Sequence, residues 1–88
     1  MKVTEKQLKH SLIEMYASTF QSAKKIMDDK YVQGRNYGMN EATHAICLLV
    51  FGGDKMLKMW ELCIRHDEND RWQDIVKEIE ETIMVDEV

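Results

Sequence analysis

The fold of this 88-residue chain depends on the stretch Ala45-Ile46-Cys47-Leu48-Leu49-Val50-Phe51, which is followed directly by Gly52-Gly53. We refer to residues 45–51 as the central run. As a helix, the central run is apolar on every side for about two turns, so every side needs cover. The run therefore predicts either close wrapping by the other segments or help from a second subunit, and we expect it to form part of the core.

The size and composition of the chain indicate one small domain. The net charge is −4, and its distribution is uneven: residues 1–66 carry a net charge of +3, and residues 67–88 carry −7. The acidic end argues against broad nucleic-acid binding by that segment. Cys47 and Cys63 lie in apolar contexts, which predicts reduced thiols rather than a disulfide. With no signal-peptide pattern at its start and no apolar stretch of membrane-spanning length, the chain is expected to be soluble and cytoplasmic.

Helical periodicity divides the chain into four segments. Thr4 and Gln7 form a capping-box pattern, and apolar residues then recur at spacings of three and four. The glycines of residues 33–39 indicate a loop, and Asn40 and Asp54 are candidate N-caps for the two helices that follow. Asp70 and Gln73 suggest a fourth capped start. The helices are thus expected at about 5–31, 41–51, 55–65 and 71–84.

These segments predict an all-α fold, a compact bundle of about four helices in a single domain over residues 1–88. The long first helix and the amphipathic last helix would cover a central apolar hairpin. A buried strand at 43–51 is the rival interpretation, since isoleucine, valine and phenylalanine favour sheets. No second strand is visible to pair with it.

Two short histidine–cysteine pairs form the sharpest chemical pattern. His44 and Cys47 lie three residues apart on one expected helix, and Cys63 and His66 lie three apart on the next. An antiparallel hairpin would bring the pairs together, and two thiolates with two imidazoles suit tetrahedral zinc. Buried cysteines and helix-end histidines explain the same pattern without a metal. We therefore expect no metal site and no cofactor.

The glycine-bearing stretch with Arg35 and Tyr37 precedes the expected Asn40 cap, so it is a candidate anion-binding loop or partner contact. A plain flexible connection is the favoured interpretation. Residues 41–65 also resemble a helix-turn-helix, but a recognition helix should present polar and basic side chains, and this one is mainly apolar. Nucleic-acid reading remains the alternative function.

An acidic ridge at helical spacing marks the last part of the chain. It is a candidate docking surface for a basic partner by electrostatic steering, or simply a solvated face. Its members are Asp67, Asp70, Asp74, Glu78 and Glu81.

No catalytic order of residues is present, and apolar surroundings raise the pKa of a thiol, which is the opposite of activation. In its general character the chain is similar to small proteins of phages and mobile elements, which favours a protein that modulates a host component. The sequence thus predicts a non-catalytic regulator, inhibitor or adaptor that binds a protein through an apolar patch and the acidic ridge. The wide apolar faces and seven methionines also predict a homodimer.

Overall fold

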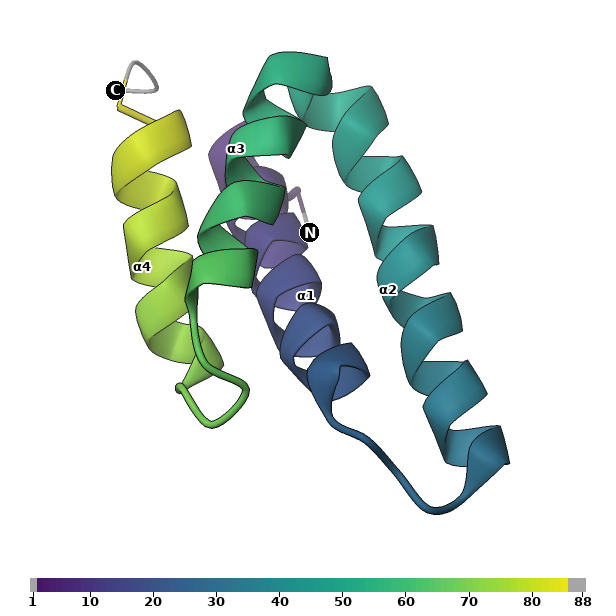
Figure 1. Cartoon of the computed structure of the whole chain (residues 1–88). Coiled ribbons are helices and arrows are strands. Elements are labelled where there is room, and N and C mark those ends of the chain that lie inside the picture. Colours follow the sequence, from purple (N-terminus) through teal and green to yellow (C-terminus); the bar gives the residue numbers. More distant parts are fainter. Residues whose placement is uncertain (1, 86–88) are drawn as a thin grey trace.

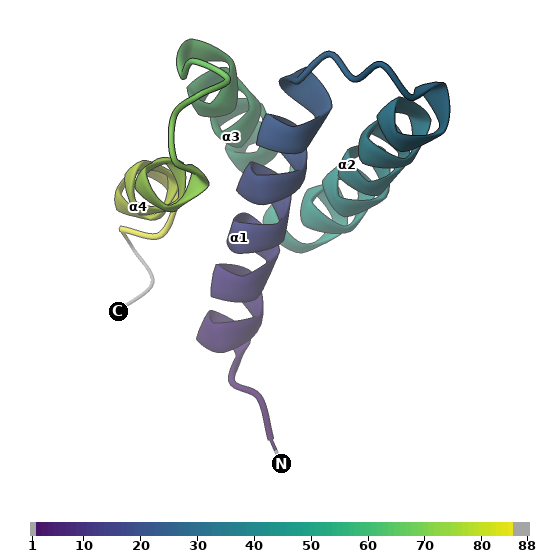
Figure 2. The same ribbon diagram turned by 90° about the horizontal axis from the view of Figure 1, so that it is seen from below.

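A computed structural model describes residues 2–85 of the chain. Four helices follow one another within these residues, and no strand is present in them: α1 (Glu5–Lys24), α2 (Lys30–Phe51), α3 (Gly53–Arg65) and α4 (Trp72–Ile83). Figure 1 shows α2 and α4 at opposite edges of the molecule, with α1 and α3 between them, and Figure 2 shows α2 splayed away from α4. The expected all-α bundle of four helices is confirmed.

The first helix begins where the capping box predicts and ends earlier than expected. The Thr4 hydroxyl accepts a hydrogen bond from the Gln7 N–H at 3.1 Å, and the Gln7 side chain accepts one from the Thr4 N–H at 2.9 Å. The expected helix over 5–31 is wrong at its end, because Lys25 has an extended backbone. Asp29 then starts α2, since its carboxylate accepts from the Tyr31 N–H at 2.8 Å.

The second helix absorbs the whole region expected to be a loop. Gly34 and Gly38 lie inside α2, so the predicted loop over 33–39 and the helix start at Asn40 are both wrong. The Asn40 side chain instead donates to the Thr19 hydroxyl of α1 at 3.1 Å. Each glycine costs helix stability, about 1 kcal/mol relative to alanine. A good N-cap and packing against α1 sustain α2 through both positions.

The glycine pair ends α2 as predicted. Gly52 has a φ of 87°, a left-handed conformation that side-chain-bearing residues rarely adopt, and it reverses the chain directly into α3. The Asp54 cap is wrong, because α3 begins at Gly53 without a side-chain cap. The cap at Asp70 is also wrong: α4 begins at Trp72, and the Asp70 carboxylate accepts from the Asp67 N–H instead.

The buried core lies mainly between α1, α3 and α4. Tyr16, Met59 and Ile79 are among its fully buried side chains, one from each of these helices. From the central run only Cys47 is buried, and Leu49 is 87% exposed. The expectation that the central run forms core is therefore wrong. The three-helix core leaves α2 pressed against α1 by one face, and α2 does not touch α4 within the described residues.

Two side chains near the end of α1 hold the turn between α3 and α4. The Gln21 amide donates to the backbone carbonyls of Asp67 at 2.8 Å and Asp70 at 3.0 Å. The Lys24 ammonium donates to the carbonyl of Cys63 at 2.6 Å and to that of His66. These carbonyls lie at or just beyond the C-terminal end of α3, where a cation is favoured.

Candidate functional site

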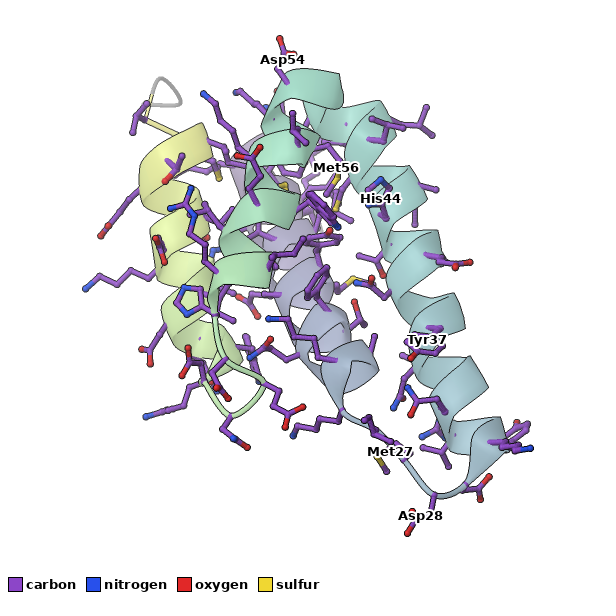
Figure 3. The ribbon with its side chains drawn as sticks, viewed as in Figure 1. Met27, Asp28, Tyr37, His44, Asp54 and Met56 are labelled. Atoms are coloured by element: carbon purple, nitrogen blue, oxygen red, sulfur yellow. The ribbon has the colours of Figure 1, made fainter. Side chains whose placement is uncertain are left out.

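A groove of about 270 Å³ lies between the C-terminal half of α2 and the first two turns of α3. Figure 3 shows His44 and Met56 in the space between these helices. Met56 is buried, while Leu48, Leu57 and Trp60 expose about half of their surface. The side chains and the glycine that line the groove are His44, Leu48, Gly53, Met56, Leu57 and Trp60.

The groove is chemically suited to hold an apolar side chain of another molecule. The His44 ring lies 5.9 Å from the Tyr16 ring, centroid to centroid, and this contact with α1 supports the α2 side of the groove. Tryptophan is among the residue types that most often dominate binding energy at interfaces, and Trp60 lies half-exposed here beside two leucines. We call the set Leu48, Leu57 and Trp60 the groove residues.

Sequence reasoning missed the groove because it counted α3 as largely buried. Met56, Met59 and Cys63 are buried, and Leu57, Trp60 and Ile64 form a second apolar row that remains exposed. Each row has helical spacing by itself. Two apolar rows on a helix that has only one core to contact are a signal that one row has no cover in the chain.

The acidic ridge is divided between internal contacts and exposed side chains. Asp67 and Asp70 lie in the turn before α4, and the other three members lie on α4. His66 joins two members: its Nδ1 lies 3.0 Å from the Asp70 carboxylate, and its Nε2 lies 2.6 Å from that of Glu78. Part of the ridge thus stabilises the chain itself. Its role toward a partner stays a prediction, with Asp74 and Glu81 as its exposed members on α4.

Two histidines link elements through carboxylates. The hydrogen bond from His66 to Glu78 raises the pKa of His66, burial opposes it by a smaller amount, and Asp70 adds a further contribution that raises the pKa. His10 contacts Glu80 of α4 and Glu14 of its own helix, and the Glu80 hydrogen bond is the main cause of its raised pKa. In their protonated forms, His66 ties the end of α3 to α4 and His10 ties α1 to α4.

Stability should fall as the pH rises above about 6.5 and the two histidines lose their protons. Both histidines have folded-state pKa values above the usual 6.5, so their stabilisation is present below that pH and is lost on titration through the folded value. Partly exposed bridges contribute roughly 0.5–1 kcal/mol each. Melting temperatures followed by circular dichroism should drop by several degrees.

The double substitution His10→Gln and His66→Gln should remove most of this pH dependence. His44→Gln is the matched control, because within residues 2–85 His44 contacts the Tyr16 ring and makes no hydrogen bond or ion pair to a carboxylate. An unchanged pH profile in the double variant would show that these two bridges do not couple protonation to folding.

The two cysteines lie in the core rather than in a reactive site. Burial raises the pKa of Cys47 to about 11 and that of Cys63 to about 12, so both thiols are protonated at neutral pH. The His66 ring bonds to the carboxylates of Asp70 and Glu78, and the His44 ring packs against the Tyr16 ring. Within residues 2–85, no cluster of three or more His, Cys, Asp or Glu side chains is placed to hold a metal ion.

Arg35 and Tyr37 were expected to lie in a loop at a helix start. Both lie within α2 instead. The anion-site interpretation, which needs free N–H groups at a helix N-terminus, is therefore wrong. Both side chains are exposed, and Figure 3 shows Tyr37 on α2, far from the ridge on α4. A contact with a partner at these residues stays a prediction.

A larger hollow, about 780 Å³, lies between the start of α1 and the end of α4. Lys6 and Lys77 face it together with Glu80 and Glu81. Such a mixture of charges selects neither an anion nor a cation, and His10 is already bonded to Glu80. This hollow offers a weaker case for specific binding than the groove.

Comparison with protein-family models, with curated proteins and with solved structures finds no match for this chain. None of the helices within residues 2–85 is both long enough and apolar enough to cross a membrane.

Proposed function

We propose that this chain is a small non-catalytic protein that binds another protein and so regulates, inhibits or adapts it. The groove is the observation that supports the proposal. Its apolar walls face water, and an apolar group of a partner that occupies the groove would remove this surface from water, which favours binding. A proline-free α3 with half-exposed Leu57 and Trp60 presents a rigid wall that needs little ordering on binding.

The segment that fits the groove best is an amphipathic helix of the partner. Such helices insert apolar side chains at spacings of three and four into grooves between helices. Asp74 and Glu81 add negative charge on the exposed side of α4, and the chain as a whole carries −4. A partner with basic residues would therefore be attracted over long range, chiefly through a faster association rate.

Removing the groove side chains should weaken partner binding strongly. Trp60→Ala and Leu57→Ala are each expected to raise the Kd by about 30-fold or more, the size of a binding hot spot of about 2 kcal/mol. The partner is first captured with the full chain and then purified. Calorimetric titration of the purified partner with each variant gives the Kd values.

Leu8→Ala is the matched control, because Leu8 is about as exposed as Leu57 but lies on α1, outside the groove. It should leave the Kd unchanged. A partner that binds all the variants equally would exclude the groove as its site. Binding of random duplex DNA at low salt, in place of a protein, would support the nucleic-acid alternative.

A further inference from the structure

The first half of α2 is held to the rest of the fold by few contacts. No residue between Gln21 and Thr43 is buried, whereas α1, α3 and α4 each bury at least four residues. The second half of α2 buries Cys47 and packs Phe51 against the core. We call residues 30–42 the arm; Figure 1 shows its beginning at a corner of the molecule, joined to α1 by an extended connection. Because burial of apolar surface is the main stabilising contribution to a fold, the arm is stabilised less than the other helices.

Within residues 2–85, the hydrogen bonds that join the arm to α1 come from amide side chains. Asn40 donates to the Thr19 hydroxyl at 3.1 Å, and Asn36 donates to the Ser22 carbonyl at 3.5 Å. A third bond, donated by Gln33 to the end of α1, measures 3.4 Å. The last two separations exceed the usual N–H···O distance of about 2.9–3.0 Å, so these bonds are weak. A hollow of about 150 Å³ beside them shows that the two helices do not pack closely there.

Two glycines lower the intrinsic helix stability of the arm. Gly34 and Gly38 both lie inside the helix, and nothing lies within 4 Å of where a Cβ at either position would be. Packing therefore does not require glycine at these positions, and each glycine still weakens the helix. A helix as short as the arm is marginal in water when it is isolated. The arm therefore keeps its helix only while it lies on α1.

We infer that the arm opens from α1 and unfolds as one unit, while the three-helix core and the second half of α2 stay folded. The opening stops at Thr43, because the Thr43 side chain is buried. Cys47 lies one turn further along, and its thiol donates to the Leu12 carbonyl across a 3.7 Å separation. Local opening of this kind is typical of segments with few buried apolar contacts.

The arm is thereby a conformational device with a closed and an open form. A molecule that binds only one form shifts the balance between the two. Arg35 and Tyr37 lie on the arm, so a partner that contacts both in their helical arrangement selects the closed form. The α2 side of the groove begins at His44, beyond the point where the opening stops, so the groove persists in both forms. Opening of the arm and occupation of the groove are separate events.

Amide hydrogen exchange of the full chain, followed residue by residue by nuclear magnetic resonance, tests the inference. After correction for intrinsic rates, the amides of residues 34–42 should exchange about 100-fold faster, or more, than those of Ile13 and Ile79 in the core. The amides of the arm should share one opening equilibrium. Their protection should also depend less on urea concentration than that of the core, because opening exposes less surface than global unfolding does.

Two glycine variants test the cause of the opening. Gly34→Ala and Gly38→Ala should each slow exchange in the arm about fivefold, which corresponds to about 1 kcal/mol of helix propensity. Gly53→Ala is the matched control, because it makes the same change in α3, where nothing lies within 4 Å of the added Cβ either. It should leave exchange in the arm unchanged. Trp60→Ala should also leave it unchanged, which separates this inference from the proposed function.

Three results would each overturn the inference. The first is protection of the arm equal to that of α1. The second is protection that rises gradually from Lys30 to Thr43, which would show fraying of a helix end in place of opening as a unit. The third is exchange in the arm that neither Gly34→Ala nor Gly38→Ala slows.

Discussion

Replacing Ile79 with alanine is expected to lower the free energy of unfolding by about 3 kcal/mol. Ile79 is fully buried on α4, within the core that α1 and α3 also line. Truncation removes three carbon atoms from this packing and leaves a cavity that rigid helices close only in part. In a domain of 88 residues such a loss is a large fraction of the total stability. Urea unfolding followed by circular dichroism at one fixed protein concentration measures it.

Ile26→Ala is the matched control, since it makes the same chemical change at a side chain that is 94% exposed. Its cost should stay below about 0.5 kcal/mol. Equal losses at the two positions would contradict the division into a three-helix core and an exposed connection between α1 and α2.

Replacing Lys24 with methionine is expected to cost about 2 kcal/mol of folding free energy. The ammonium donates to the carbonyls of Cys63 and His66, and it lies 5.4 Å from the centre of the Phe20 ring. Methionine keeps most of the aliphatic stem but leaves these carbonyls, at or just beyond the end of α3, without a cationic donor. Thermal unfolding should therefore shift down by roughly 8–15 °C.

Lys25→Met provides the comparison, because the neighbouring lysine is exposed and only its backbone N–H bonds to α1. It removes the same charge and should change stability by less than about 0.5 kcal/mol. Similar melting temperatures for the two variants would show that the contacts of Lys24 with α3 contribute nothing beyond its charge.

Sequence patterns predict the helices best where capping chemistry and periodicity agree. Thr4 with Gln7 marks the start of α1, and the glycine pair marks the end of α2. At the remaining helix boundaries, residues that favour a loop compete with caps and tertiary packing that favour a helix, and the sequence does not show which effect is larger. Gly34 and Gly38 suggest a loop locally, yet the Asp29 cap and the packing of α2 on α1 outweigh their cost.

The exposure of the central run could not be read from its residue types. The composition of an apolar helix shows how much apolar surface must be buried. Its periodicity does not show which segment or partner buries that surface. Cys47 is the only fully buried residue of the run and Phe51 is partly buried against the core, while Leu48 and Leu49 are exposed. The excess of apolar surface over available partners was visible in the sequence. Which side chains remain uncovered depends on the rotation of α2 against α1.

The acidic ridge illustrates a second limit. Spacing alone placed Asp70 and Glu78 on a common face, and both do lie near the α3–α4 junction. Their partner His66 directly follows α3, and nothing in its local sequence distinguishes an internal bridge from a solvated end. Expected partner residues and internal stabilising residues were therefore mixed in one set.

The split between core and uncovered surface has a consequence for how this protein can change over generations. The side chains that hold the fold belong mostly to α1, α3 and α4, and those open to other molecules lie on α2 and the outer row of α3. Substitutions at the open positions therefore escape most of the selection for folding. On the proposed binding function, a lineage can alter what the protein recognises by small steps while its scaffold stays the same. Such independence of recognition from folding is an advantage for any binder whose target itself varies.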